Sequence, residues 1–249
     1  VIPSTFKNEF RITPEQVAAA ITPRTKAILI SYPSNPTGAT ATRGMMESIV
    51  KLAREHDLYI ISDEIYDRLT YDGVHTCLPT IPGAYERTIL LNGFSKAYAM
   101  TGWRIAYAAG PTDIIDAMMK IHQYTMLCAP VMGQIAALEA ITNCYRESEE
   151  MIEQYAQRRR VIVKGLIDAG LPCHMPGGAF YAFPSIRETG LTSDEFCERL
   201  LFEENVAVVP GTAFGECGEG YIRCSYATSI EKIEEAMVRV ARFVGKLKS

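Results

Sequence analysis

Three short apolar runs in the first half of the chain constrain its fold more than any other feature. They cover Ala27 to Ile30, Leu58 to Ile61 and Thr88 to Leu91, and each is nearly continuous in apolar or β-branched residues. Such runs are typical of strands buried on both faces of a parallel sheet. Helical periodicity between them, as in Arg43 to Glu55, predicts crossover helices. Right-handed βαβ units then predict an α/β fold with a doubly wound, mostly parallel sheet, to which Arg104 to Ala109 adds a strand.

The second half of the sequence predicts a smaller C-terminal α+β domain. A long helix is expected from Glu147 to Ala169, with Gly170 placed to end it. The other predicted elements are strand-like segments and two helices: Pro172 to Pro184, Val206 to Val209, Tyr221 to Ser225, a helix opening at Thr192, and a last helix carrying Ile233 to Leu247. We therefore expect residues 1–125 to belong to the larger domain, 126–150 to form a connecting helical region and 151–249 to form the smaller domain.

Charge and cysteine usage narrow the possible functions. The net charge is −4 and 48% of residues are hydrophobic, an ordinary globular composition, and the scattered Lys and Arg residues argue against nucleic-acid binding. No run of about 18 apolar residues exists, so no membrane span is expected.

Seven widely spaced cysteines without a C-x-x-C pair are typical of reduced thiols in a cytoplasmic protein. The four histidines share no ligand spacing with them, so no metal site is expected.

Polar side chains directly follow each of the three predicted strands. The first runs into a segment containing Asn35, the second into Asp63 and Tyr66, and the third into Ser95 and Lys96. Ligands of open α/β sheets bind outside the carboxyl ends of the strands, so these groups are expected to share a crevice. Taken singly, each has a structural interpretation as a turn, a helix cap or a solvated surface residue. Their coincidence at matching strand ends favours a functional site.

Four motifs together resemble those of the fold-type I pyridoxal-phosphate aminotransferases of classes I and II. They are S-N-P-T-G at 34–38, D-E-I-Y at 63–66, G-F-S-K-A-Y-A-M-T-G-W-R at 93–104 and Y-I-R-C-S at 221–225. The resemblance covers essentially the whole chain, with order and spacing kept. It implies a pyridoxal 5′-phosphate-dependent transferase of amino acid metabolism that moves an amino group between an L-amino acid and a 2-oxo acid. It also implies a homodimer.

The resemblance implies catalytic roles for three residues. Lys96 resembles the lysine that forms a Schiff base with the cofactor aldehyde and then moves the substrate α-proton as a general base. Asp63 resembles the carboxylate that keeps the cofactor ring nitrogen protonated. Tyr66 resembles a donor to the cofactor's phenolic oxygen, a role that Asn35 shares.

Other matching residues are implied to bind phosphate and substrate. Ser95 and Arg104 resemble phosphate ligands, because a guanidinium and a loop hydroxyl suit that anion. Arg223 resembles the arginine that grips the substrate α-carboxylate, which Asn35 would also touch. Gly93 stands where some members of the family carry a further serine, so one phosphate hydroxyl is expected to be absent.

The first residues, Val1-Ile2-Pro3, are apolar and strand-like, whereas natural N-termini are more often polar. We therefore expect a C-terminal fragment that begins within the large domain. In the family, the preceding region supplies a glycine-rich phosphate-binding turn, an aromatic that stacks on the cofactor, and a tyrosine lent to the neighbouring subunit.

Several alternatives stay open from the sequence. A lyase or synthase of the same fold would use the same cofactor, and a non-catalytic fragment or sensor domain would keep only the scaffold. The amino donor is also open: aspartate, alanine and aromatic amino acids all fit. Arg146 and Arg187 are candidate partners for an acidic side chain, although both also fit solvated surface charges.

Overall fold

The computed structural model describes residues 1–247, which form two compact units. Unit 1 comprises Val1–Ile2, Arg11–Pro33 and Thr40–Met151. Unit 2 comprises Pro3–Phe10, Ser34–Ala39 and the chain from Ile152 onward. Two short segments from the N-terminal part of the sequence thus belong to the same unit as the C-terminal part. Among the described residues, no helix is both long and apolar enough to cross a bilayer.

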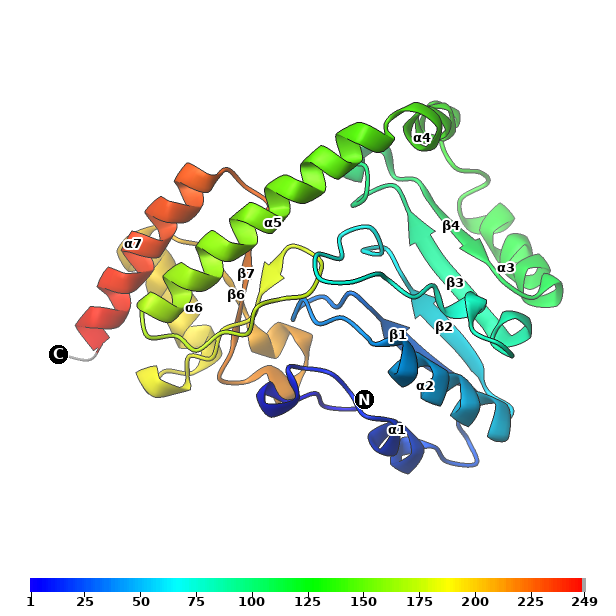
Figure 1. Cartoon of the computed structure of the whole chain (residues 1–249), viewed down its shortest axis with the longest axis horizontal. Coiled ribbons are helices and arrows are strands. Elements are labelled where there is room, and N and C mark those ends of the chain that lie inside the picture. The colour runs from blue at the N-terminus through cyan, green and yellow to red at the C-terminus, as the bar shows by residue number, and fades with distance from the viewer. Residues whose placement is uncertain (248–249) are drawn as a thin grey trace. The chain divides into compact units, whose positions relative to one another are not determined.

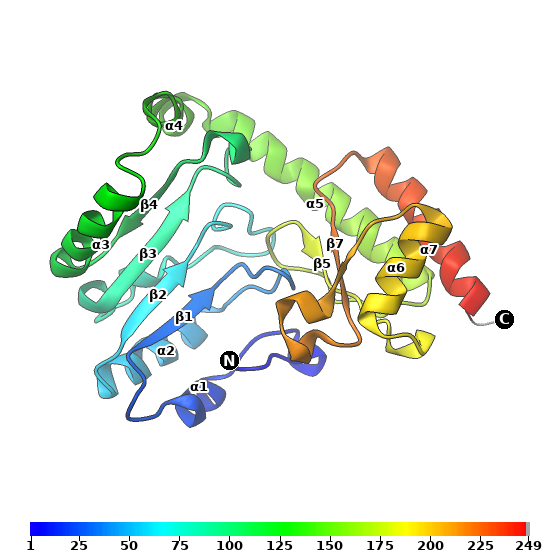
Figure 2. The same cartoon turned by 180° about the vertical axis from the view of Figure 1, so that it is seen from behind.

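Unit 1 is built on one four-stranded sheet in the order β1-β2-β3-β4 (Figure 1). The first three strands are parallel and the fourth is antiparallel to the third. Figure 2 shows the four strands side by side from behind. Their bounds are Ala27–Ser31 for β1, Tyr59–Asp63 for β2, Thr88–Gly93 for β3 and Ala106–Ala109 for β4. The expected α/β class with a mostly parallel sheet is confirmed.

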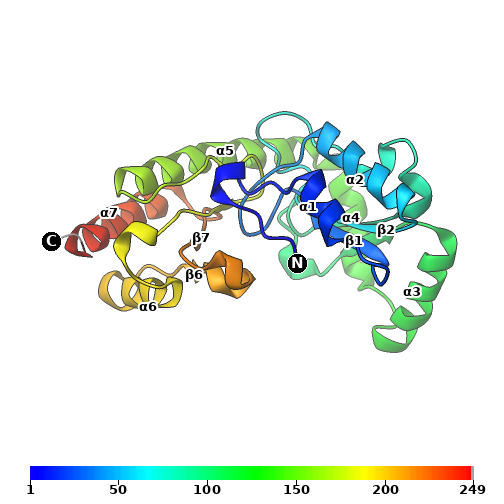
Figure 3. The same cartoon turned by 90° about the horizontal axis from the view of Figure 1, so that it is seen from below.

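Four helices of unit 1 accompany the sheet: α1 (Pro14–Ala20), α2 (Arg43–Glu55), α3 (Thr112–Thr125) and α4 (Val131–Asn143). In Figure 3, α1 and α2 lie on one side of the sheet and α3 lies on the other. The helical periodicity of α2 is confirmed, because the four apolar residues of its predicted face are buried: Met46, Ile49, Val50 and Ala53.

The expectation that every strand is buried on both faces is wrong for β1. Its burial alternates: Ile28 and Ile30 are buried, whereas the side chain of Leu29 is 70% exposed. Successive side chains of a strand point to opposite faces of the sheet. In residues 1–247, the helices α1 and α2 cover one face at β1, and the face that carries Leu29 stays open.

Unit 2 combines helices with a small antiparallel sheet in the order β5-β7-β6. Its core includes Phe196 of α6 and Phe243 of α7, whose rings meet edge to face with centroids 5.2 Å apart. The elements are α5 (Tyr145–Asp168, in unit 2 from Ile152 onward), β5 (Tyr181–Ala182), α6 (Ser193–Glu204), β6 (Val209–Pro210), β7 (Ile222–Ser225) and α7 (Ile230–Leu247). Short 3₁₀ turns in the chain cover Phe6–Asn8, Leu78–Thr80, Tyr85–Arg87, Thr101–Trp103, Arg187–Thr189, Gly211–Phe214 and Glu216–Gly218.

Helix ends follow the sequence signals closely. Gly170 has a positive φ of 82°, and the neighbouring Leu171 N–H donates to the carbonyl of Leu166, which closes α5 as predicted. Thr192 and Glu195 form a reciprocal capping box at the start of α6. Thr13 forms another with Gln16 at the start of α1.

The strand-like reading of Pro172 to Pro184 is wrong for most of its length, since only Tyr181–Ala182 forms a strand. The backbone of this segment is used elsewhere: the Gly178 N–H donates to the carbonyl of Gly38, and the Pro172 carbonyl accepts from Ser185. The strand expected over Val206 to Val209 is also displaced, because β6 covers Val209–Pro210.

The N-terminal segment Pro3–Phe10 packs within unit 2, which the sequence did not indicate. The centre of the Phe10 ring lies 5.4 Å from the ring centres of both Phe183 and Tyr221. Nε2 of His174 lies 2.7 Å from the Phe6 carbonyl oxygen. Aromatic contacts of this kind hold the segment against the small sheet.

Candidate functional site

The carboxyl ends of β2 and β3 in unit 1 carry the predicted acid, phenol and amine. Asp63 is the last residue of β2, Tyr66 follows in the next turn, and Lys96 lies three residues beyond the end of β3. Tyr66 is buried, and the Lys96 Nζ lies 5.9 Å from the centre of its ring. The sheet thus brings Lys96 and Tyr66 together, as expected for residues at neighbouring strand ends.

Asp63 is held in the middle of the sheet. Its backbone pairs with Ser31 of β1 on one side and with Leu91 of β3 on the other. One carboxylate oxygen accepts a 3.1 Å hydrogen bond from the Ile65 backbone N–H. This turn fixes the direction of the carboxylate relative to the strand.

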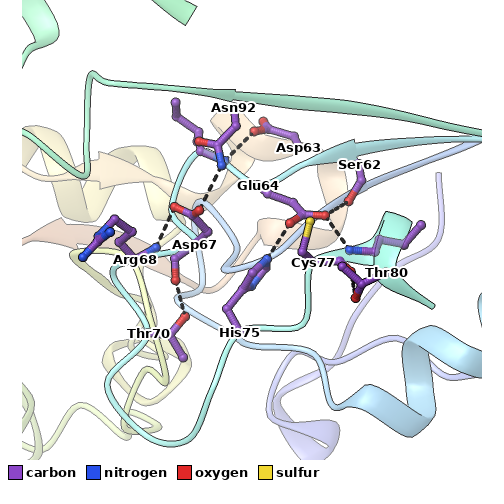
Figure 4. Close-up of polar contacts among 12 residues, drawn as sticks. Ser62, Asp63, Glu64, Asp67, Arg68, Thr70, His75, Cys77, Thr80 and Asn92 are labelled. Carbon is purple, nitrogen blue, oxygen red and sulfur yellow. Dashed lines mark hydrogen bonds and ion pairs between the residues drawn. The ribbon is translucent and has the colours of Figure 1, made fainter. Parts of the chain in front are cut away.

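A buried carboxylate next to Asp63 holds the segment that follows β2 (Figure 4). Glu64 is 2% exposed and accepts hydrogen bonds from the Ser62 hydroxyl at 2.9 Å, the Leu78 backbone N–H at 2.9 Å and His75 Nε2 at 2.6 Å. Burial acts to raise the pKa of Glu64, but these hydrogen bonds outweigh it, so its pKa lies below the ordinary value. The group is therefore an anion at neutral pH.

A second polar link joins the turn after β2 to the end of β3. The Asn92 side chain donates to the Asp67 carboxylate at 3.0 Å and accepts from the Gly93 N–H at 2.7 Å. The other Asp67 oxygen accepts from the Arg68 N–H at 2.7 Å. Because Lys96 follows β3 directly, this link ties the lysine segment to the turn that carries Tyr66.

Gly93 has a packing reason for standing where related motifs carry serine. A Cβ built at this position would lie 2.9 Å from both the Ile105 carbonyl oxygen and the Ala106 Cα of the neighbouring antiparallel segment. A side chain would force β3 and β4 apart. The absence of a serine hydroxyl at this position therefore accompanies the close pairing of β3 with β4.

The two predicted phosphate ligands lie on the same segment. Ser95 is half-buried directly before Lys96, whereas Arg104 is exposed at the end of the Thr101–Trp103 turn, with a positive φ of 56°. The described hydrogen bond of the Arg104 guanidinium goes to the Thr101 carbonyl at 2.8 Å and not to Ser95. The structure therefore leaves most of the Arg104 guanidinium open to solvent.

In unit 2, the structure brings together the two predicted substrate-binding residues, Asn35 and Arg223. The Arg223 Nη1 donates to the Asn35 side-chain oxygen at 2.9 Å. The guanidinium carbon lies 4.6 Å from the ring centre of Tyr181 and 4.8 Å from that of Phe214. Its Nε is buried and has no hydrogen-bond partner in the described part of the chain, which leaves a donor unsatisfied.

The segment that carries Asn35 is anchored within unit 2. The Ser34 N–H donates to the Ala39 carbonyl, and the Gly178 N–H donates to the Gly38 carbonyl. Gly38 has a φ of +69°, and a Cβ there would lie 2.3 Å from the Cβ of Pro176. Only glycine permits this close approach. The S-N-P-T-G turn and the segment from Pro176 to Gly178 thus form one interlocked surface.

Sequence reasoning missed the supporting residues. The sequence gives no signal that Tyr181 and Phe214 contact Arg223, because this contact depends on the packing of segments that are distant in sequence. For the Glu64–His75 pair, the sequence gives one weak signal: Glu64 is a second acidic residue directly after Asp63. Arg146, a candidate for substrate binding, is 85% exposed and pairs with Glu150 one helical turn away, as the surface interpretation predicts.

The residues present fit pyridoxal phosphate by their chemistry. The cofactor has an aldehyde, a ring nitrogen, a phenolic oxygen and a phosphate. Unit 1 offers an amine beside a buried phenol and a carboxylate held in a defined direction, and Ser95 and Arg104 offer phosphate donors. Lys96 would hold the aldehyde carbon and Asp63 the ring nitrogen.

Comparison with known proteins shows the family to which the chain belongs. Residues 1–240 match the family model described as aminotransferase class I and II. The chain is 52% identical to a putative aminotransferase of Bacillus subtilis, 46% identical to an aspartate aminotransferase of Pyrococcus abyssi and 44% identical to aromatic-amino-acid aminotransferase 2 of Thermococcus litoralis. These matches cover 98–99% of this chain but only 63–64% of the relatives' own lengths.

Solved structures give the same result. An aromatic aminotransferase from Pyrococcus horikoshii superposes with a TM-score of 0.97 at 45% identity, covering 99% of this chain and 67% of that one. A Thermus thermophilus aspartate aminotransferase with maleate superposes with a TM-score of 0.91 at 41% identity, covering 97% of this chain and 63% of that one. The resemblance expected from the motifs is confirmed: the chain belongs to the class I and II aminotransferases, a family of pyridoxal-phosphate-dependent enzymes.

Proposed function

We propose that this chain serves in a pyridoxal-phosphate-dependent aminotransferase that moves an amino group between an L-amino acid and a 2-oxo acid. The observation that carries the proposal is the contact of Lys96 with the buried Tyr66 at the carboxyl edge of the sheet, beside Asp63. The bound cofactor would supply an aldehyde that takes up the amino group and a ring that accepts electrons from the substrate.

Each of the other candidate residues has a proposed role in binding the cofactor or in moving a proton. We propose that Lys96 holds the cofactor covalently and, once released, moves the proton at the substrate α-carbon as a general base. Asp63 holds a proton on the ring nitrogen, for which an oriented anion is suited. Tyr66 donates to the phenolic oxygen, with Asn35 as a second donor. Ser95 and the exposed Arg104 bind the phosphate.

Arg223 is proposed to bind the substrate α-carboxylate. Its planar guanidinium lies close to two aromatic rings and donates to Asn35, and its buried Nε has no acceptor among the described residues. A carboxylate can accept two parallel hydrogen bonds from such a fork. For the donor amino acid we propose aspartate or an aromatic amino acid, because relatives at 44–46% identity carry those names.

We further propose that residues 1–125 belong to the large cofactor-binding domain, except Pro3–Phe10 and Ser34–Ala39, which group with the C-terminal part of the chain, and that 126–150 form a connecting region and 151–249 the small domain. A homodimer is supported by large apolar side chains exposed on α3 and α4. These include Ile121, Tyr124, Val131, Met132, Ile135 and Leu138.

A cytoplasmic location is supported by the odd number and wide spacing of the cysteines.

A transamination assay tests the proposal. The chain is incubated with pyridoxal phosphate, 2-oxoglutarate and either aspartate or phenylalanine, and the formation of glutamate is followed. We expect glutamate formation that requires the added cofactor and disappears in Lys96→Ala, whereas the exposed Lys120→Ala retains it. Equal rates in wild type and Lys96→Ala, or no transfer from either donor, would contradict the proposed activity.

A further inference from the structure

Glu64 and Asp63 are neighbours in sequence, but their side chains serve opposite faces of the sheet. Successive side chains along a strand alternate, so Ser62 and Glu64 point away from the face on which Asp63 lies (Figure 4). The Glu64 carboxylate bonds to Ser62 on that far side, which keeps it from touching a ligand of Asp63. Any effect of Glu64 on the site must therefore pass through the backbone.

The hydrogen bonds of Glu64 close the segment between β2 and the Leu78–Thr80 turn. Its carboxylate binds His75 Nε2 and the Leu78 backbone N–H, while its own backbone N–H donates to the Leu91 carbonyl of β3 at 2.9 Å. The side chain of His75 is 16% exposed and that of Glu64 is 3% exposed. Solvent therefore competes little with this pair, and buried charged hydrogen bonds are the strong ones.

The groups facing this pair do not supply a substitute partner. The Cys77 thiol has its pKa raised to about 12 by burial and by the nearby Glu64 carboxylate, so it stays neutral. The Asp67 carboxylate is engaged by Asn92 and the Arg68 N–H. Tyr107 also has its pKa raised, by burial and then by nearby anions that include Glu64. Among the described contacts, the His75 ring is the side chain that lies within hydrogen-bond distance of the second Glu64 carboxylate oxygen.

The backbone N–H that orients Asp63 belongs to Ile65, the residue directly after Glu64. Ile65 N–H donates to the Asp63 carboxylate at 3.1 Å, and the following Asp67 N–H donates to the Glu64 carbonyl at 2.9 Å. A peptide plane held on one side by Glu64 fixes the direction of this donor. Displacing Glu64 would turn the donor away from Asp63.

We propose that Glu64 and His75 are positioning residues: by fixing the Ile65 peptide, they hold the Asp63 carboxylate in the direction in which it meets the cofactor ring nitrogen. The proposal rests on the proposed function for the identity of that ring nitrogen. The hydrogen-bond geometry itself belongs to this chain and can be measured without any ligand.

The first test is amide hydrogen exchange on the whole chain without ligand, in wild type, His75→Gln and Glu64→Gln. His56→Gln is the matched control, because His56 is exposed and directly follows the end of α2. We expect the Ile65 amide to exchange about tenfold faster in His75→Gln, as for loss of one hydrogen bond to a charged group, while the amides of β1 and β3 keep their rates. An unchanged Ile65 rate, or equal acceleration across the sheet, would overturn the proposal.

The second test compares two ligands, pyridoxamine 5′-phosphate and its analogue with carbon in place of the ring nitrogen. We expect His75→Gln to weaken binding of pyridoxamine phosphate about tenfold and that of the analogue less than about twofold, since only the former meets Asp63. Glu64→Gln should show the same selectivity, and His56→Gln should change neither ligand. Equal weakening of both ligands would mean a merely structural role and would overturn the proposal.

The two tests separate this proposal from the proposed function. If wild type binds neither ligand, the proposed function fails for this chain, and the Ile65 exchange rate alone decides whether Glu64 and His75 hold Asp63. If wild type binds both ligands with equal affinity, Asp63 does not meet the ring nitrogen and the positioning role is overturned.

Discussion

Arg223 shows how several weak contacts produce one oriented group. Two aromatic rings lie within 5 Å of its guanidinium carbon, and the Asn35 amide oxygen accepts from one of its nitrogens. Stacking on rings suits the planar guanidinium and leaves its edge free to meet a carboxylate. The lysine ammonium has neither the plane nor the fork.

We therefore expect Arg223→Lys to raise the KM for the amino donor by about tenfold or more, the equivalent of one charged hydrogen bond, with a smaller change in kcat. Steady-state kinetics measure both. Arg146→Lys is the control, because Arg146 is exposed and pairs only with its helix neighbour Glu150 among the contacts described. An unchanged KM in Arg223→Lys, or an equal rise in both variants, would place the carboxylate elsewhere.

Gly38 is a residue at which both the backbone conformation and the packing exclude a side chain. Its positive φ and the 2.3 Å approach of a built Cβ to Pro176 both forbid a side chain. We expect Gly38→Ala to lower the free energy of unfolding by about 2 kcal/mol or more, from strain and overpacking together. Gly44→Ala is the control, since a Cβ there meets nothing within 4 Å. Urea denaturation compares the two, and equal stability would contradict the interlocked turn.

At the scale of elements, helices could be predicted well because their signals are local. The apolar face of α2, the capping boxes of α1 and α6 and the glycine that ends α5 each depend on residues within about two turns. Strand burial could not be predicted in the same way. Whether Leu29 is covered depends on which distant segment packs on that face.

Besides the ring contact of Phe196 with Phe243, a buried anion links α6 to α7. The side chain of Glu204 is 1% exposed and accepts from Lys246 at 2.8 Å and from Arg242 of α7. Hydrogen bonds from Arg242, and then from Lys246, lower the pKa of Glu204 to about 2. A carboxyl with a depressed pKa stabilises the folded state at pH values above its unfolded value.

This contribution should disappear as the pH falls from about 4.5, the ordinary value, towards about 2. We expect the difference in unfolding free energy between wild type and Glu204→Gln to be constant from pH 7 to about 5 and to shrink below that. Glu198→Gln, on the exposed side of α6, should show no such pH dependence. A difference that stays constant down to pH 2 would show that the Glu204 carboxylate is not the titrating link.

At the scale of the whole molecule, the sequence predicts the site residues that follow the ends of strands. It does not predict the residues that contact them from distant parts of the same chain. Lys96, Asp63 and Tyr66 follow from the position of polar residues after apolar strands. Arg223 contacts two aromatic rings that lie 42 and 9 residues before it in the sequence, at Tyr181 and Phe214. Glu64 and His75 are 11 residues apart. Sequence periodicity carries no information about such contacts.

The exposed apolar surface of α3 and α4 belongs to the proposed homodimer. Ile135 and Leu138 of α4 are 65% and 63% exposed, so a charge there should not unfold the helix. We expect Leu138→Asp to shift the chain from dimer to monomer in sedimentation velocity, because an unpaired charge in an apolar interface is costly. Asn143→Asp, at the exposed end of α4, adds the same charge and should leave the dimer intact. A wild-type monomer would contradict the homodimer.

The most direct test of the central claim is covalent trapping on the lysine. The chain is mixed with pyridoxal phosphate and reduced with borohydride, and the labelled peptide is then mapped by mass spectrometry. We expect one pyridoxyl group on Lys96, beside the buried Tyr66, with the label lost in Lys96→Ala and retained in Lys120→Ala. Label spread evenly over exposed lysines, or absent from Lys96, would contradict the assignment of Lys96 as the cofactor-binding residue.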